Sequence, residues 1–466
     1  MEKPSFYHAI KIDYDKCIGC THCMTVCPTQ AVRIVKGKAL LNPARCIDCG
    51  ECFRVCPTLA YSVMHDNMEV LNKFKTRVAL VPGVFFGQFP DNIPISQIHL
   101  AMKHLGFSHV YEIEGGVEIL KGAFNRMVTS EEYEKPLISS FCPSIVRLIQ
   151  VRFPGLVGNI APLIAPADIA AIYYRKKLAE SGVNPKETGI FYVTPCAAKI
   201  AAFKSPVGEE VSALDGVINL NFLFNKVYLL IIQGTIISDD PATEILLELP
   251  DEKSIRWSLT NGEAKNISGR ALCIDGIKNV IDFLEKIENE EVSNIDFLEL
   301  RACDESCAGG ILTAENRFLT VERLNKRARK HGQLIRDNPV VISTSFADKA
   351  DYLLKRIILP QKIEPRSIVL DEDMLKAMQK LKKSRELMCF LPAIDCGACG
   401  APTCQALAED IVSQKANLSH CIFMQRQMEK HRKLSNDHAF KIIEKVWGAS
   451  RLDKDCYKKG AKYETN

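Results

Sequence analysis

The chain has no long apolar run, little net charge and few histidines. No stretch approaches the roughly 18 to 20 apolar residues of a membrane-spanning helix, and residues 1–12 carry charges without the apolar core of a secretory signal. A formal net charge of +4 over 466 residues is too small and too dispersed to indicate a nucleic-acid or anionic-membrane partner. We therefore expect a cytoplasmic protein that binds neither nucleic acid nor membrane.

Cysteine, by contrast, is abundant and clustered. The 19 cysteines are an odd number, and most stand in CxxC-type groups rather than scattered as in a disulfide framework. This pattern indicates a reducing compartment and metal-bound thiolates. Only His22 and His420 lie close to these groups in the sequence, and the repeated units use sulfur alone. The donor set favours iron–sulfur cubanes over mixed Cys/His zinc sites.

The chain is long enough for several domains with real cores. Its length alone suggests about three units. The apolar share of 47% and the charged share of 25% are those of folded globular proteins, which excludes wholesale disorder. Together with the motifs below, the pattern predicts a two-cluster domain in 1–70, a central domain in 75–351, a helical linker in 352–385, a second cluster domain in 386–425 and a basic helical tail in 426–466.

A cysteine motif is repeated near the start of the chain. Residues 17–28 read CIGCTHCMTVCP and residues 46–57 read CIDCGECFRVCP. The spacing C-x2-C-x2-C-x3-C-P is that of bacterial two-cluster ferredoxins, in which the fourth cysteine of each run ligates the other cluster. One 4Fe-4S cubane would take Cys17, Cys20, Cys23 and Cys56, and the other Cys46, Cys49, Cys52 and Cys27. Because about 60 residues build little core, the clusters would hold this α+β, ferredoxin-like unit together. A pair of zinc knuckles is the competing interpretation.

The middle of the chain alternates strand-like and helix-like segments. The pattern predicts strands over 78–84 and 190–193 and a helix over 95–105, and hence an α/β architecture. Its cysteines lie far apart in sequence, at expected strand ends or turns: Cys142, Cys196, Cys303 and Cys307. Four thiolates from three loops could converge on one cluster. Taken singly, Cys142 or Cys196 could equally be a small buried hydrophobe, and we expect that role for Cys273.

Three of these stretches resemble a known family. Residues 140–143 read SFCP, residues 194–199 read TPCAAK, and residues 303–310 read CDESCAGG. In the same order, they are similar to the cluster-binding motifs of iron-only (FeFe) hydrogenases, which read approximately TSCCP, MPCTAK and ACPGGCxxGG. The run 153–167 is similar to the family's stretch after the first motif. The resemblance implies a hydrogenase large-subunit-like domain over most of the middle segment.

The resemblance also implies roles for single residues. Cys142, Cys196 and Cys303 would be ligands of a cubane, and Cys307 would bridge that cubane to a two-iron site carrying CO and cyanide. Lys199 matches the family's lysine that donates to an iron-bound cyanide, where an ammonium suits an anionic ligand. The other interpretation of Lys199 is an ordinary exposed lysine. The motif glycines at 309 and 310 would let the backbone approach the cluster closely.

The chain departs from the family pattern at the proton relay. Where the family has a second cysteine before the first cubane ligand, this chain has Phe141, and a phenyl ring cannot transfer a proton. Thr194 replaces the family's methionine, and residues 304–306 replace its Pro-Gly-Gly. The family's acidic pair is not recognisable in residues 120–123. These losses resemble the divergent hydrogenase groups proposed to be hydrogen sensors, so we expect low turnover.

A further cysteine group lies near the end of the chain. Its members, spaced C-x2-C-x4-C-x16-C, are Cys396, Cys399, Cys404 and Cys421. The spacing resembles the single-cluster 4Fe-4S domain of the Rnf-complex B subunit and of corrinoid iron–sulfur proteins, with a helix over 404–411. A structural zinc site is the alternative, since four thiolates suit either metal. Cys389 and Cys456 fall outside the spacing and are expected to be free thiols. From about residue 426 we expect a helix leaning to Lys and Arg with a solvated face, ending in a disordered stretch.

Taken together, these features predict a FeFe-hydrogenase-like oxidoreductase that interconverts H2 with protons and electrons, slowly and in a sensory setting. The four cubanes would relay electrons to a redox protein such as ferredoxin, and a signalling partner would receive the sensory output. The alternative is a protein of a different class, an electron-transfer or cluster-binding protein whose middle domain holds only a cubane, as in the eukaryotic hydrogenase-like assembly factors.

Overall fold

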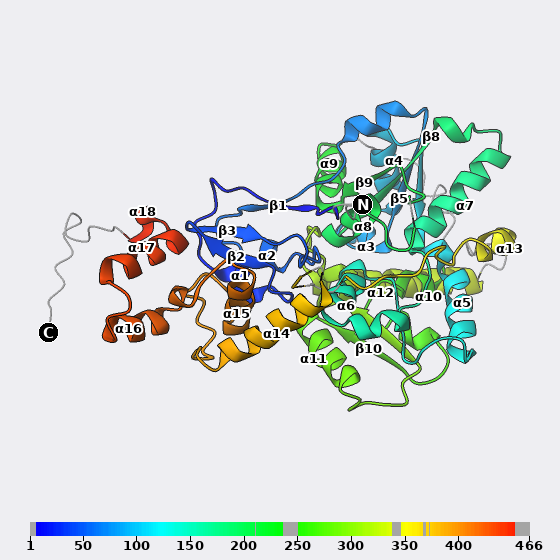
Figure 1. Cartoon of the computed structure of the whole chain (residues 1–466). Helices are drawn as coiled ribbons and strands as arrows, with labels where there is room; N and C mark the ends of the chain where they lie inside the picture. The colour runs from blue at the N-terminus through cyan, green and yellow to red at the C-terminus, as the bar shows by residue number, and fades with distance from the viewer. Residues whose placement is uncertain are drawn as a thin grey trace. The chain divides into compact units, whose positions relative to one another are not determined.

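A computed structural model describes residues 6–209, 211–235, 250–337, 346–366, 370–371 and 373–452 (Figure 1). The chain forms two compact units. The central unit comprises Met1–Ala9, Ile47–Gly50 and Val63–Arg366, and the terminal unit comprises Ile10–Cys46, Glu51–Ser62 and Ser367–Asn466. Among the described residues, no helix combines the length and apolar character needed to cross a membrane.

The central unit contains two parallel sheets. The first has the order β6-β5-β8-β9, formed by His109–Glu112, Thr76–Val81, Thr188–Thr194 and Gly216–Asn219. The second has the order β10-β11-β7, formed by Ala271–Asp275, Phe297–Arg301 and Leu137–Ile138. Strands β8 and β11 are buried along their whole length, as expected of parallel strands covered on both faces.

Helices connect and cover these strands (Figure 1). In chain order they are α3 (Gly83–Phe86), α4 (Ile95–His104), α5 (Val117–Thr129), α6 (Pro143–Arg152), α7 (Pro166–Glu180), α8 (Ala197–Lys204), α9 (Leu220–Ile232), α10 (Glu252–Arg256), α11 (Ile277–Glu288), α12 (Arg317–Asp337) and α13 (Ala350–Leu354). Helices α4 and α9 pack on each other, and their apolar faces share a core with β5 and β8. The expected α/β class is confirmed.

The segments predicted from the pattern agree with the structure in type, and their boundaries differ by at most three residues. The helix over 95–105 is α4, and the strand over 190–193 is the middle of β8. The strand predicted over 78–84 is β5, which ends at Val81. It ends there because Pro82 has no N–H to donate to a ladder and caps the short helix α3, which begins at Gly83.

The terminal unit joins segments from both ends of the chain. From the first part come β1 (Ile10–Ile12), which pairs with β4 (Tyr61–Val63), α1 (His22–Val26), the antiparallel hairpin β2 (Val32–Val35) and β3 (Lys38–Leu41), and α2 (Glu51–Arg54). From the last part come α14 (Met374–Met388), α15 (Cys404–Val412), α16 (Ile422–Lys430), α17 (Asn436–Trp447) and α18 (Ala449–Leu452). The first part is ferredoxin-like and α+β, and the last part is helical, as expected.

Specific polar contacts hold the two parts of this unit together. Arg33 Nε lies 2.6 Å from Asp410 Oδ2 in a largely buried ion pair. The Ile34 N–H donates to the Gly400 carbonyl at 2.8 Å. The first and last cysteine groups are therefore neighbours within one compact unit, although they lie at opposite ends of the sequence.

The segment after residue 426 differs from the single helix expected there. Helix α16 ends at Lys430, Arg432 has a φ of 53°, and Ser435 caps α17 by accepting from the His438 N–H. The chain therefore turns and starts a new helix. The stretch expected to be disordered, with Cys456, lies outside the described residues.

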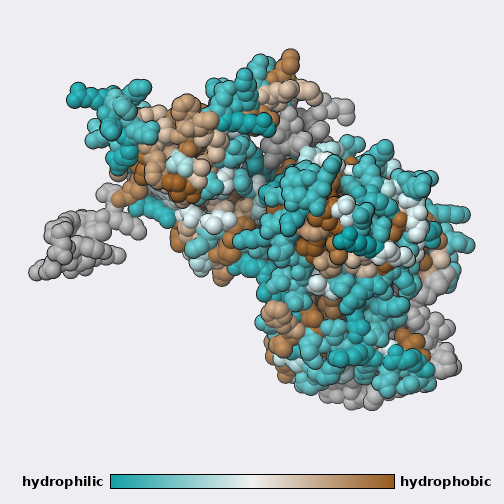
Figure 2. Space-filling view, turned by 90° about the horizontal axis from the view of Figure 1, so that it is seen from below, coloured by the Kyte–Doolittle hydropathy of each residue, from teal (hydrophilic) through white to brown (hydrophobic). Residues whose placement is uncertain are grey.

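The surface carries scattered apolar side chains in a hydrophilic background (Figure 2). On the terminal unit, the exposed large apolar residues of α14 are Met374, Leu375, Met378 and Leu381. At the C-terminal end of this helix, Leu387 and Met388 pack against the core around α15.

Candidate functional site

Each cysteine of the central motifs follows the carboxyl end of a parallel strand. Strand β7 leads to Cys142, β8 to Cys196 and β11 to Cys303. Ligands in α/β proteins commonly bind outside the carboxyl ends of the strands. Cys142 and Cys196 are also the N-cap residues of α6 and α8, where the helix N-terminus favours a negative charge.

The side chains from these loops meet around Lys199. Lys199 Nζ lies 3.4 Å from Cys307 Sγ. Burial raises the pKa of Cys196 to about 11, the Cys142 thiolate adds to the rise, and the Lys199 ammonium opposes it. Cys142, Cys196 and Cys307, from three loops, are therefore close enough to interact electrostatically.

The third motif forms a tight turn. Cys303 begins the turn that carries Cys307, and its carbonyl accepts from the Ser306 N–H at 3.1 Å. Glu305 and Ser306, which stand where the family has glycines, both adopt positive φ. At Gly309, an added Cβ would collide with the Asp304 carbonyl, so the turn needs that glycine.

Two cations lie over the ring at the relay position. The Phe141 ring centroid is 4.3 Å from Lys199 Nζ and 3.9 Å from Arg301 Cζ. Burial alone would lower the pKa of Lys199, but the charges of Cys307 and the neighbouring acidic groups together outweigh burial and raise the pKa above its usual range. Burial also lowers the pKa of Arg301, but the charges of Glu263, Glu299 and the nearby thiols together raise that pKa above its usual range. Both side chains are cations, and an anionic group bound beside the thiols would be stabilised by them.

A buried carboxylate pair supports Arg301, and the sequence interpretation missed it. Arg301 Nη2 lies 3.0 Å from Glu263 Oε2, and Arg301 Nε lies 3.4 Å from Glu299 Oε1. All three residues are at most 1% exposed. Burial raises the pKa of Glu263, Arg301 lowers it, and Glu299 raises it again. The available signal was a glutamate and an arginine inside the otherwise apolar strand β11, since such residues are seldom fully buried unless paired.

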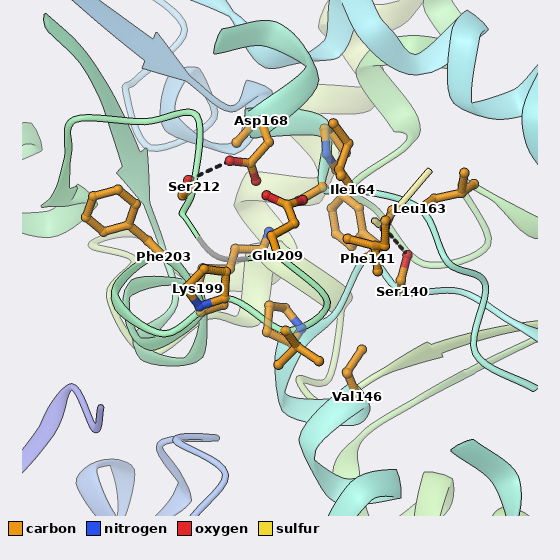
Figure 3. A pocket seen from close by; sticks show the side chains of 18 of the residues that line it. Ser140, Phe141, Val146, Leu163, Ile164, Asp168, Lys199, Phe203, Glu209 and Ser212 are labelled. Atoms are coloured by element: carbon orange, nitrogen blue, oxygen red, sulfur yellow. Dashed lines mark hydrogen bonds between the residues drawn. The ribbon is translucent and has the colours of Figure 1, made fainter. Parts of the chain in front are cut away.

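A largely apolar pocket opens beside these residues (Figure 3). It encloses about 920 Å³ of empty space, part of it open to solvent, and both Phe141 and Lys199 line it. Its polar lining includes Asp168, whose Oδ1 accepts from Ser212 Oγ at 2.6 Å, and Glu209. Burial raises the pKa of Glu209 to about 7, and the Asp168 carboxylate adds to the rise. The pocket has a cation at one place and titratable carboxyls at another.

Glu209 should make stability depend on pH in the neutral range. Its folded pKa of about 7 lies above the ordinary 4.5, so its stabilising contribution is complete below about 4.5 and is lost as pH rises through about 7. As pH rises from about 6 to about 8.5, the free energy of unfolding of the parent chain should fall by about 1 kcal/mol more than that of Glu209→Gln. This figure allows for the partial exposure of Glu209. Thermal unfolding of both chains at the two pH values measures this, and parallel losses would refute it.

The cysteines of the N-terminal repeat also gather in space. Burial raises the pKa of Cys23, and the thiolates of Cys20, Cys17 and Cys56 raise it further. Cys56, from the second run, therefore lies with the first run, the crossing expected of a two-cluster ferredoxin.

The other predicted set of this repeat shows the same crossing. Burial raises the pKa of Cys52 well above its usual range, and the charges of Cys46 and Cys27 raise it further. The fourth expected ligand, Cys49, is partly buried. The sulfur-only donor sets fit cubanes.

The C-terminal cysteines line one small pocket of about 280 Å³. The four thiols in its wall are Cys396, Cys399, Cys404 and Cys421. Burial raises the pKa of Cys399 to about 11, and neighbouring Cys396 and Cys421 contribute. Gly397 and Gly400 have φ of 73° and 81°, so tight turns surround the pocket. Cys389 is exposed and lies outside the pocket lining. Four converging thiols fit a cubane and also fit zinc.

Comparison with protein families gives three matches. Residues 76–225 match the iron only hydrogenase large subunit, C-terminal domain. Residues 9–57 match the 4Fe-4S dicluster domain, and residues 391–423 match an Fe-S cluster family. The first matched segment contains Cys142 and Cys196 but ends before Cys303 and Cys307, whereas the other two contain the whole first and last cysteine groups.

Similar proteins point the same way. The chain is 30% identical over 218 residues to the periplasmic Fe hydrogenase large subunit of Nitratidesulfovibrio vulgaris, covering 42% of this chain and 51% of that protein. It is 26% identical over 203 residues to the NADP-reducing hydrogenase subunit HndD of Solidesulfovibrio fructosivorans, covering 39% of this chain and 30% of that protein. The chain thus matches about half of the first relative and less of the second.

Solved structures with related folds include FeFe-hydrogenases. A hydrogenase studied for oxygen inactivation of its H cluster matches with a TM-score of 0.47 and 15% identity, over 65% of this chain and 98% of the other. A variant of FeFe-hydrogenase HydA1 from Chlamydomonas reinhardtii matches with a TM-score of 0.44 and 15% identity, over 65% of this chain and 98% of the other. The chain is therefore similar to the iron-only hydrogenases over residues 76–225, with 4Fe-4S segments before and after that part.

Proposed function

We propose that the chain interconverts H2 with protons and electrons at a cysteine-bound H-cluster, slowly and in a sensory role. The observation that carries this proposal is the Lys199 ammonium 3.4 Å from Cys307 Sγ, beside a pocket that Lys199 itself lines. A cation held against a thiolate at the mouth of an apolar pocket suits a small anionic group bound to that thiolate.

The residues present fit such a group. Cys142, Cys196, Cys303 and Cys307 would hold a cubane, and Cys307 with Lys199 would hold a two-iron subcluster bearing CO and cyanide. When bound, that group supplies the cleavage and formation of H2. Arg301 adds a second positive charge near the same thiols, because the charges of Cys307 and Cys142 both act on its pKa. The apolar pocket walls keep bulk water away from the bound group.

Protons need a route that avoids Phe141. One buried set of titratable groups beside this ring is Glu263, Arg301 and Glu299, in which Arg301 contacts both carboxylates and the Phe141 ring. The charge of Lys199 also lowers the pKa of Glu263, so the two groups interact electrostatically. Because its pKa is raised, the Glu263 carboxyl can hold a proton closer to neutral pH than an ordinary glutamate can. We assign it the part of general acid and base.

Glu263→Gln should therefore lower hydrogen turnover. The amide keeps the shape but cannot exchange a proton, so we expect a loss of roughly 100-fold. A matched control is Glu114→Gln, which changes another buried carboxyl with a raised pKa, hydrogen-bonded to the Gly83 N–H at 2.6 Å. Dye-linked H2 oxidation measures both variants. Equal rates in the two variants would remove Glu263 from the proton route.

The remaining cubanes would carry electrons between the centre and a redox protein such as ferredoxin. The loop that includes Cys49 is fixed within the central unit, because the buried Asp48 carboxylate accepts from Arg147 Nη1 at 2.9 Å. Arg147 lies on α6, the helix that starts after Cys142. The slow turnover expected from Phe141 suits a sensor whose state passes to a signalling partner.

The second candidate is an electron-transfer or cluster-binding protein without hydrogen chemistry. The departure at Phe141 favours it. Counting iron in anaerobically reconstituted chain loaded with the two-iron precursor separates the candidates, because about sixteen irons per chain fit cubanes only and about eighteen require the extra pair. A count near sixteen together with no H2 oxidation would reject the proposed function.

A further inference from the structure

The last two helices contact the binding loop of the first cubane. Arg451, on α18, donates from Nη1 to the Ile18 carbonyl at 2.8 Å and to the Gly19 carbonyl. These two residues lie between Cys17 and Cys20, two expected ligands of one cubane. A solvated tail would make no such contact, so this segment has a role at the cluster loop.

The same segment contacts the binding loop of the C-terminal cubane. Trp447, at the end of α17, donates from Nε1 to the Ala398 carbonyl at 2.9 Å. Ala398 lies between Cys396 and Cys399. Arg451 Cζ is 5.1 Å from the Trp447 ring centroid. Trp447 and Arg451, four residues apart in sequence, therefore link the two cluster loops.

Close backbone packing fixes this arrangement. The Gly37 N–H, in the turn between β2 and β3, donates to the Val446 carbonyl at 2.8 Å. Gly19 and Gly37 have φ of 62° and 71°, and a Cβ at either would collide with backbone, with the Gly37 carbonyl and the Trp447 carbonyl respectively. A Cβ on Gly400 would collide with the Ile34 carbonyl. Each of these close backbone contacts requires glycine, so the packing between the two parts of the unit is specific.

We infer that α17 and α18 position the C-terminal cubane beside the Cys17 cubane, so that electrons pass directly between these two clusters. The inference rests on the cluster assignments of the proposed function but not on its hydrogen chemistry. The step moves one electron: one cubane is oxidised from the +1 to the +2 state and the other is reduced from +2 to +1, with no proton transferred. Trp447 and Arg451 are positioning residues for this transfer.

Arg451 should also tune the cubane it contacts. A guanidinium at the cluster loop favours the more negative, reduced state, because charge and hydrogen bonding near a cluster set its reduction potential. Without that charge, the Cys17 cubane should be harder to reduce. The Trp447 N–H should have little effect on the reduction potential, because it holds the C-terminal cluster loop in place without adding charge.

The test is electron paramagnetic resonance during a reductive titration of the full chain, reconstituted anaerobically without the two-iron precursor. In the parent chain we expect the spectrum of the reduced Cys17 and C-terminal cubanes to show spin–spin coupling. Arg451→Gln should shift one cubane to a lower potential, and Arg451→Lys should restore it. Trp447→Phe should weaken the coupling without that shift.

Matched controls use the neighbouring helices. Arg426→Gln removes an exposed arginine of α16 whose Nη1 pairs with Glu429 Oε2 at 2.8 Å, and Phe440→Leu changes an exposed ring of α17. Both should leave the titration unchanged, and iron counts check that every variant keeps its cubanes. Arg451→Gln and Trp447→Phe spectra that match the controls would overturn the inference, as would the absence of coupling in the parent chain. A chain without hydrogen activity could still show the expected coupling and potential shift. The proposed function and this inference can therefore be rejected independently of each other.

Discussion

Lys199→Ala is expected to remove the two-iron subcluster and leave the four cubanes in place. The ammonium is the group held at 3.4 Å from Cys307 Sγ at the pocket, and alanine offers no donor to an anionic ligand there. Loss of one donor to a buried anion at a reacting centre costs roughly 100- to 1000-fold in rate. Iron should fall from about eighteen to about sixteen per chain.

The control for this variant lies on the same helix. Lys204→Ala removes a lysine of α8 whose Nζ pairs with Asp66 Oδ1 at 2.6 Å, away from the pocket lining. It should keep both iron and hydrogen turnover. If Lys199→Ala retained the full iron content and activity, the assignment of Lys199 to the bound group would be wrong.

Phe141→Cys is expected to raise hydrogen turnover, by roughly 100-fold if the missing relay is the main limit. A thiol at this position can carry a proton, whereas the ring cannot. The substitution also removes the contacts of the ring with Lys199 and Arg301, each worth about 0.5 to 2 kcal/mol. The variant should therefore be faster and less stable.

Phe141→Ala separates the two effects of this substitution. It removes the ring without supplying a thiol, so it should lose stability and gain no rate. H2 evolution rates and thermal unfolding of the two variants provide the comparison. Equal rates in Phe141→Ala and Phe141→Cys would show that opening the pocket matters more than the relay.

The local patterns of the sequence were enough to predict the class of the fold. Strand β8 and helix α4 follow from apolar periodicity, because each is covered by the core that the periodicity anticipates. The end of β5 was placed too late, since Pro82 and the short helix α3 interrupt an apolar run that continues in sequence. The gathering of the closely spaced cysteines was equally accessible, because only a short stretch of chain separates the members of each group.

Contacts between residues far apart in sequence could not be predicted from local patterns. Glu263 meets Arg301 only because the segment that precedes β10 folds against strand β11, which carries both Glu299 and Arg301. Trp447 and Arg451 looked like parts of a solvated tail, and only their packing shows that they reach two cluster loops. Cys273, expected to be a buried hydrophobe, is partly exposed and its Sγ accepts from the Asn261 N–H at 3.0 Å.

The most direct measurement is the infrared spectrum of the full chain after loading with the two-iron precursor. If Cys307 and Lys199 bind the subcluster in the pocket beside Phe141, the spectrum will contain CO and cyanide stretching bands that Lys199→Ala lacks. A loaded chain with intact cubanes and neither kind of band would contradict the account.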